Sequence, residues 1–464
     1  MRKKLLIGFL AGAMALTAAI GLAGCDLFGG GKSDDGEPNG VVYTKSDDGT
    51  YFIVTDCKGY LADITILGKY NKLPVKKIDW RAFRDCEHLE SITIPDSITH
   101  IDENAFNGCT NLRSITVAEG NTTYHSAGNC IIETASKTLI IGCTGSVIPT
   151  DGSVEHVGER AFWECTPAQP FSVPASVETI GKEAFYKCGS VTGVSGVKEI
   201  GERAFYDCPS LTSVSIPSET TSIAKEAFSH CNHITSLTLE NGVTTVGEEA
   251  FFGCYDVQSL TIPESVTTIE ASAFNGLQSI TELVSPNSVT KIGEAAFLGC
   301  ARLESFSLGT GVDVISESMF AGCYALTHVT VPEGIETIRD KAFSHCTGLE
   351  SISFPATLTE LGEEVFLNCE KLSNVGFTDS VTTIGAGAFA NCTSLSYVKL
   401  FYGLQRLGDG VFSGDTNLAR IDFTGTKSDW EMVHRSNLKW NEGIHDIRIH
   451  CTDGKVDETF YPWP

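Results

Sequence analysis

The sequence predicts a repeat solenoid, in which short units stack and each unit buries its apolar face against its neighbours. Three observations carry this prediction. An Ala-Phe pair or a close variant recurs with a step of 23 residues through most of the chain. Only two steps differ, with 56 residues from Phe106 to Phe162 and 20 from Phe185 to Phe205. Between the pairs, each unit repeats a short alternating segment, then commonly a proline, a second apolar pair and a glycine.

The repeated phenylalanines define the units along the chain. They are Phe83, Phe106, Phe162, Phe185, Phe205, Phe228, Phe251, Phe274, Phe297, Phe320, Phe343, Phe366, Phe389 and Phe412. A solenoid grows by adding coils, so the length of 464 residues does not require several separate globular domains.

One unit shows what each segment is expected to form. Residues 91–94 alternate polar and apolar side chains, which favours a half-buried strand, and Pro95 ends it because proline has no N–H to donate. Ile98 and Ile101 give a second apolar pair on a return segment. Sequences such as residues 248–251 favour one helical turn with acidic residues near its start. We expect a β-rich solenoid with a parallel sheet on one face and a single helical turn in each coil.

The repeated pattern is L-x-S-I-x-I-P followed by V-x-x-I-G-x-x-A-F, with clear copies at residues 211–228 and 260–274. This pattern resembles the BspA-like class of bacterial leucine-rich repeats over residues 64–423. The family is bacterial and found at the cell surface, and its studied members are implicated in adhesion to host proteins and other cells. The resemblance therefore implies a leucine-rich repeat solenoid that binds protein or glycan partners.

The N-terminus predicts export. A basic start at residues 2–4 precedes the apolar stretch 5–20, which is too short for a typical membrane-spanning helix. Residues 22–25, Leu-Ala-Gly-Cys, resemble the lipobox of bacterial lipoproteins. We expect a signal peptide at residues 1–24 and lipid attachment at Cys25, followed by a flexible tether up to residue 40. The alternative is an ordinary signal peptide that happens to contain a cysteine.

The flanks and the long step interrupt the repeat. Residues 41–63 are expected to cap the first coil. Residues 424–464 resemble the segment that commonly follows such repeats, and we expect them to cap the last strand, whose open edge would invite association. The long step contains an insert at about residues 121–146, where the apolar runs 130–133 and 139–141 flank a polar turn and predict a hairpin.

Cysteine is frequent, with 17 residues in the chain. Twelve of them follow a repeat phenylalanine by three positions: Cys86, Cys109, Cys165, Cys188, Cys208, Cys231, Cys254, Cys300, Cys323, Cys346, Cys369 and Cys392. Two other coils place Leu277 and Asp415 in this slot. Because leucine substitutes there, we expect the twelve to be free thiols in the core. Cys130 and Cys143 lie on either side of the inserted hairpin, where a bridge could join them.

No motif for catalysis or metal binding stands out. The chain lacks G-x-S-x-G, H-E-x-x-H and a phosphate-binding glycine loop. His230 and His233 flank Cys231, but they occupy variable turn positions and are expected to be solvated. We predict no enzyme activity, no cofactor and no metal. The formal net charge of −25 also argues against nucleic-acid binding, because such a surface repels phosphates.

The strand residues that face outward are the expected binding surface. Most of this column, which begins at Thr93, consists of small hydroxyl-bearing residues. Toward the C-terminus it becomes larger and charged, and tyrosine and arginine are enriched in binding hot spots. The candidate partner-binding residues are His328, Asn374, Tyr397, Lys399, Arg420 and Asp422. The alternative is ordinary sequence drift near a solenoid end.

These predictions combine into one functional hypothesis and one alternative. The hypothesis is an exported protein, lipid-anchored to the bacterial cell membrane or cell surface, that binds a protein or glycan ligand, for example in adhesion. The alternative is a structural or assembly protein of the cell envelope with no host ligand. Capture of ligand from host material or from the bacterium's own envelope would separate the two.

Overall fold

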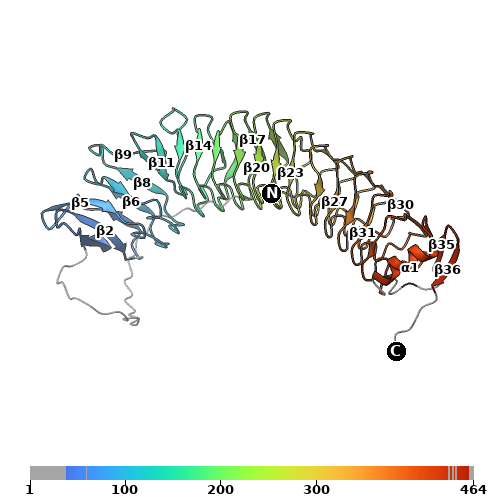
Figure 1. Cartoon of the computed structure of the whole chain (residues 1–464). Helices are drawn as coiled ribbons and strands as arrows, with labels where there is room; N and C mark the ends of the chain where they lie inside the picture. Colours follow the sequence, from blue (N-terminus) through green and yellow to red (C-terminus); the bar gives the residue numbers. More distant parts are fainter. Residues whose placement is uncertain (1–37, 59, 437–438, 441–443, 445–446, 459–464) are drawn as a thin grey trace, which may run out of the picture. The chain divides into compact units, whose positions relative to one another are not determined.

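The computed structural model describes residues 38–58, 60–436, 439–440, 444 and 447–458. The coils stack in sequence order from the strands near Pro38 to α1 and β36 at the other end (Figure 1). Most regular coils contribute one short segment to each of two series of parallel strands, which we call the first and second ladders, and each ladder consists of several hydrogen-bonded sheets. The predicted solenoid is therefore confirmed. The predicted signal peptide and Cys25 lie outside the described residues.

The first ladder contains the strands predicted from the alternating segments. Its parallel members are β3 (Asp63–Thr65), β6 (Ser91–Ile94), β8 (Ser114–Val117), β13 (Phe171–Ser172), β15 (Val191–Ser195), β17 (Ser213–Ile216), β19 (Ser236–Leu239), β22 (Glu282–Val284), β24 (Ser305–Ser307), β26 (His328–Thr330), β28 (Ser351–Ser353), β30 (Asn374–Gly376), β32 (Tyr397–Leu400) and β34 (Arg420–Phe423). Neighbouring strands pair in register, as in Ile92 with Ile115. Most of their apolar residues point inward and are buried, whereas Val284 of β22 is exposed.

The return segments form a second ladder of very short strands, which the sequence did not predict. Its members are β2 (Phe52–Cys57), β5 (Leu73–Ile78), β7 (His100–Ile101), β11 (Thr138–Ile141), β12 (His156–Val157), β14 (Thr179–Ile180), β16 (Glu199–Ile200), β18 (Ser222–Ile223), β20 (Thr245–Val246), β21 (Thr268–Ile269), β23 (Lys291–Ile292), β25 (Val314–Ile315), β27 (Thr337–Ile338), β29 (Glu360–Leu361), β31 (Thr383–Ile384) and β33 (Arg406–Leu407). Most of these strands bury one side chain, such as Ile101, and bond to the coils on either side.

The segment around each Ala-Phe pair is a run of turns and differs from the expected helical turn. Ala184 and Tyr186 donate their amides to carbonyls three residues earlier, Gly181 and Glu183. Phe185, between them, donates instead to Ala204 in the next coil at 2.8 Å. A helix would keep every amide within its own segment, so the alternation of local and inter-coil bonds is what joins these turns into a third ladder.

The phenylalanines form the centre of the core. Phe228, Phe251 and Phe274 are fully buried, and their rings stack nearly parallel with centroids 5.3 and 5.7 Å apart. Cysteines of the repeat slot fill the space beside them. Cys254 donates its thiol to the carbonyl of Phe228 in the preceding coil at 3.3 Å, which satisfies a buried polar atom in both residues.

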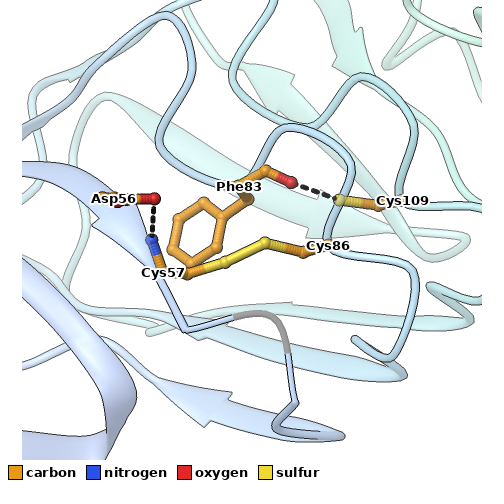
Figure 2. Close-up of a disulfide and its surroundings, with 5 residues drawn as sticks. All are labelled: Asp56, Cys57, Phe83, Cys86 and Cys109. Carbon is orange, nitrogen blue, oxygen red and sulfur yellow. Dashed lines mark hydrogen bonds between the residues drawn. A yellow bond between two sulfur atoms is a disulfide. The ribbon is translucent and has the colours of Figure 1, made fainter. Parts of the chain in front are cut away.

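One predicted free thiol is wrong. Cys86, at the start of the cysteine column, is disulfide-bonded to Cys57 of β2 (Figure 2). Figure 2 also shows Cys109 in the next coil, whose thiol donates to the carbonyl of Phe83 at 2.9 Å. Cys86 differs from the other column members because the N-terminal segment, rather than a preceding regular coil, covers it. The other eleven column cysteines are free thiols.

The N-terminal segment begins with the short 3-10 helix η1 (Pro38–Gly40) and β1 (Val41–Lys45), which pairs antiparallel with β2. β4 (Lys69–Tyr70) pairs antiparallel with β5. The C-terminal segment contains α1 (Lys427–Ser436), β35 (Ile447–Cys451) and β36 (Gly454–Glu458). β35 extends the first ladder in parallel beyond β34, and β36 pairs antiparallel with β35.

The long step holds a three-stranded antiparallel meander. β9 (Tyr124–Ala127) pairs with β10 (Cys130–Glu133), and β10 pairs with β11. β11 then pairs in parallel with β12, which returns the chain to the second ladder. Cys130 and Cys143 are both buried free thiols, so no bridge joins them.

Candidate ligand-binding surface

The outward face of the first ladder is mostly small and hydroxylated. Alternation along each strand buries one set of side chains and exposes the other, as in β19, where Leu237 and Leu239 are buried and Ser236 and Thr238 are exposed. Such positions satisfy the strand and offer hydroxyl groups to solvent. They present no large anchor side chain to a partner.

The face changes character at β32 and β34. Arg420 donates Nε to Asp422 Oδ1 at 2.6 Å and a second guanidinium nitrogen to Oδ2 at 2.8 Å. The hydroxyl of Tyr397 donates to the same Oδ2 at 3.1 Å. The carboxylate therefore accepts three hydrogen bonds, two of them from a bidentate arginine. We call Tyr397, Arg420 and Asp422 the C-terminal triad.

The electrostatics of the triad follow from these bonds. The hydrogen bond from Arg420 lowers the pKa of Asp422, and the bond to Asp422 raises the pKa of Arg420. Desolvation and the neighbouring carboxylate raise the pKa of Tyr397. At neutral pH the aspartate is ionised, the arginine is charged and the phenol is neutral. The guanidinium also lies 5.9 Å from the centre of the Tyr397 ring.

The six candidate residues fall into two groups. Lys399 is in register with Asp422 and extends over the ring of Phe401 at 5.0 Å, so it lies beside the triad. His328 and Asn374 lie on β26 and β30, which are separated by one strand of the same ladder. His328 is exposed and contacts the hydroxyl of Ser351 through Nδ1 at 3.3 Å. The structure thus brings four of the six together.

Two residues of this surface were missed from the sequence. Arg448 and His450 on β35 pair in register with Arg420 and Asp422. The Nδ1 atom of His450 lies 3.7 Å from Asp422 Oδ1. The alternating sequence Ile-Arg-Ile-His at residues 447–450 would have identified a strand with these outward side chains. The charged surface therefore continues from the repeats into the C-terminal segment.

The histidines near Cys231 serve other contacts. The His230 ring packs between Tyr206 and Phe252, with centroids 5.2 Å from each. His233 contacts Asp256 through Nδ1 at 3.0 Å. Within the described part of the chain, no group of three or more histidine, cysteine, aspartate or glutamate side chains is placed to hold a metal ion. No described helix is long and apolar enough to cross a membrane.

Comparison with known proteins gives a family and a fold. Overlapping segments at residues 60–150, 142–196, 155–281, 198–327 and 313–432 match the model described as the BspA type leucine-rich repeat region. A search of curated proteins finds no match.

Solved structures of bacterial leucine-rich repeat proteins are similar to this chain. A leucine-rich repeat protein from Bacteroides ovatus is 24% identical with a TM-score of 0.66, over 89% of this chain and 98% of the other. A leucine-rich cell surface protein from Faecalibacterium prausnitzii is 22% identical with a TM-score of 0.45, over 86% of this chain and 97% of the other. At 24% identity, the similarity to the Bacteroides ovatus protein establishes the fold alone.

Proposed function

Because the chain belongs to the BspA-type leucine-rich repeat family, we propose that it is a bacterial cell-surface protein that binds a protein or glycan ligand, in adhesion or host interaction. The long solenoid offers an extended face built from many coils, which suits a large partner better than a small molecule. The disulfide between Cys57 and Cys86 supports export, because such bonds persist in oxidising compartments outside the cytosol.

The observation that carries the proposal is the C-terminal triad. Tyr397 is 42% exposed, yet its hydroxyl is fixed by Asp422, which in turn fixes Arg420. An ordered tyrosine and arginine lose little conformational entropy when a partner binds. Both residue types are enriched in the few interface positions that dominate affinity. The triad therefore supports a binding hot spot on the strand face.

Membrane attachment through Cys25 is part of the same proposal. A thioether-linked lipid at this position would hold the solenoid at the membrane by its acyl chains, and the glycine-rich stretch that follows would act as a spacer. Metabolic labelling with a radioactive fatty acid tests this directly. Label in the wild type and none in Cys25→Ser is expected, whereas equal label in both would reject the lipid site.

The binding test uses the full-length protein, purified in detergent, as bait. It is offered host extracellular matrix and, separately, the envelope fraction of the producing bacterium, and the captured material is identified by mass spectrometry. A saturable host ligand supports adhesion. Capture of envelope components alone favours the structural or assembly role instead.

The exposed surface provides matched controls for any ligand found. Tyr397→Ala and Arg420→Ala are expected to weaken binding about tenfold each, which corresponds to about 1.4 kcal/mol. Tyr402→Ala and Arg406→Ala remove the same side-chain types from exposed positions outside the triad, and they should leave the affinity unchanged. Equal effects in both pairs, or no effect in either, would reject the triad as the site.

A further inference from the structure

The column of stacked phenylalanines is broken at the insert. Phe83 stacks on Phe106 at 5.0 Å, and Phe162 stacks on Phe185 at 5.1 Å. Between Phe106 and Phe162 the chain places Gly142, where an added Cβ would lie 2.1 Å from the Phe162 ring. A glycine backbone therefore takes the place of a ring, and the buried core divides into two clusters near this point.

The hydrogen bonds between the turn segments of adjacent coils are interrupted at the same place. In the adjoining coils the amide two positions after the phenylalanine bonds to the next coil, from Asp85 to Asn107 and from Glu164 to Tyr186, both at 2.8 Å. The equivalent amide of Gly108 has no hydrogen-bond partner among the described residues. The insert has thus separated two turn segments that would otherwise be bonded, and a cleft of about 470 Å³ lies between them.

Two tryptophans line this cleft from opposite coils. Trp80 is 46% exposed, and the guanidinium of Arg81 lies over its ring at 3.7 Å. Trp163 is half-buried and stacks on Tyr186 at 4.2 Å, nearly parallel. The guanidinium of Arg160 also lies over the Trp163 ring, 5.1 Å from its centre. Trp80 therefore offers the more open indole face, and Trp163 contributes the part of its ring that Tyr186 and Arg160 leave uncovered. Both indoles are held by neighbouring side chains, so they lose little side-chain entropy when a ligand binds.

The polar lining is already paired. Arg160 donates to Asn104 Oδ1 and to Glu183 Oε2, both at 2.6 Å. Arg84 and Asp85 form an ion pair at 3.4 Å. The lining therefore combines amide, carboxylate and guanidinium groups without a surplus of either charge. A strongly anionic or cationic ligand would gain little here, whereas a neutral ligand rich in donors and acceptors would find partners.

We propose that this cleft binds a neutral oligosaccharide. A sugar ring has an apolar C–H face that packs on an indole, and its hydroxyl groups both donate and accept hydrogen bonds. Trp80 and Trp163 supply the aromatic surfaces, and Asn104 and the amide of Gly108 supply polar groups between them. A peptide adding as a strand needs a row of open backbone groups, whereas the open amides of Trp80 and Gly108 belong to different coils and form no such row among the described residues. The inference is independent of the C-terminal triad.

The test uses the full-length protein in detergent on an array of neutral oligosaccharides of two to six sugars, with sialylated and sulfated glycans and unrelated peptides as further arms. Binding to a neutral glycan is expected, and Trp80→Ala and Trp163→Ala should each weaken it about tenfold or more. Tyr324→Ala, which removes an exposed aromatic from another coil, should leave it unchanged.

A second readout guards against misfolded variants. The same sugar should shift the tryptophan emission of the wild-type protein, and Trp80→Phe, which keeps an aromatic face, should retain most of the affinity. No binding to any neutral glycan, binding to peptides or charged glycans alone, or neutral-glycan binding that survives both alanine variants would overturn the proposal. If Arg420→Ala lost a host ligand but kept sugar binding, the result would concern the triad and would still support a separate sugar site in the cleft.

Discussion

Asp415 tests how burial affects a carboxyl group at the position three residues after the repeat phenylalanine. It occupies the position that cysteine fills in most coils, and only 1% of its surface is exposed. Neither carboxyl oxygen has a hydrogen-bond partner among the described residues. Burial raises the pKa of Asp415 to about 9, so the folded protein keeps the group protonated at pH 7.

The cost follows from the difference between the two states. In the unfolded chain the carboxyl ionises near its ordinary pKa of 3.8, whereas in the fold it stays neutral up to about 9. Each pH unit between those values favours unfolding by about 1.4 kcal/mol, which gives about 4 kcal/mol at pH 7 as an upper estimate. Because the folded pKa of this acid is raised, the contribution of Asp415 to stability is most favourable below pH 4 and becomes less favourable as the pH rises toward 9. Asp415→Cys removes the penalty.

Trp430 and Trp440 report on this end of the solenoid, because both are fully buried and their rings are 5.4 Å apart. Urea unfolding followed by their emission at pH 5, 7 and 8 should show Asp415→Cys stabilised by up to about 4 kcal/mol at pH 7, with a flatter pH dependence. Asp409→Cys, an exposed change in the same coil, serves as the control. An unchanged pH dependence in Asp415→Cys would refute the reasoning.

Three further predictions concern the core. Cys57→Ser opens the link to Cys86, 29 residues away, and should lower local stability of the first coils by about 3.5 kcal/mol, seen as faster amide exchange there; unchanged exchange would contradict it. Phe251→Ala empties a fully buried site and should cost about 3–5 kcal/mol, measured as new protease cleavage in its own coil and the adjoining ones. Burial raises the pKa of Cys254 well above its ordinary value, so alkylation of the native protein at pH 8 should spare Cys254 and modify the more accessible Cys451; equal labelling would be evidence against a buried inert thiol.

The repeat period predicted the coils because one residue type recurs at one buried position. A phenylalanine every 23 residues can bury its ring only by stacking, and the stacked rings follow that prediction. The second ladder was missed because the strands that its regular coils contribute are two residues long. A segment such as His100–Ile101 contains one inward side chain, and alternation cannot be recognised from a single position.

The disulfide could not be predicted for a different reason. Cys86 has the same local sequence context as the other cysteines of its column, and nothing within the repeat distinguishes it. Its environment depends on β2, whose position depends on pairing with both β1 and β5. Only that tertiary arrangement brings Cys57 against the first coil in place of a preceding repeat.

The residues of the triad could be predicted from the sequence because their spacing follows the 23-residue period. Tyr397 and Arg420 are one coil apart and pair in register, and Asp422 lies two residues farther along the same strand face. Arg448 breaks this rule, since it lies 28 residues after Arg420 instead of 23. Helix α1 lies between β34 and β35 and contains the additional residues. The 23-residue period alone does not predict how many residues separate these two strands.

Both proposed sites lie where the repeat changes. In a regular coil the amides of the turn segment bond to the next coil and the large side chains pack inward, so little chemistry is left for a partner. The insert releases the amide of Gly108 and separates Trp80 from Trp163, and the last coils replace outward hydroxyls with Tyr397 and Arg420. Restoring a regular step at the insert should therefore abolish sugar binding without unfolding the protein. A variant that shortens the insert to a 23-residue step would lose the sugar and keep the triad's ligand, whereas loss of both would mean that the solenoid acts as one surface.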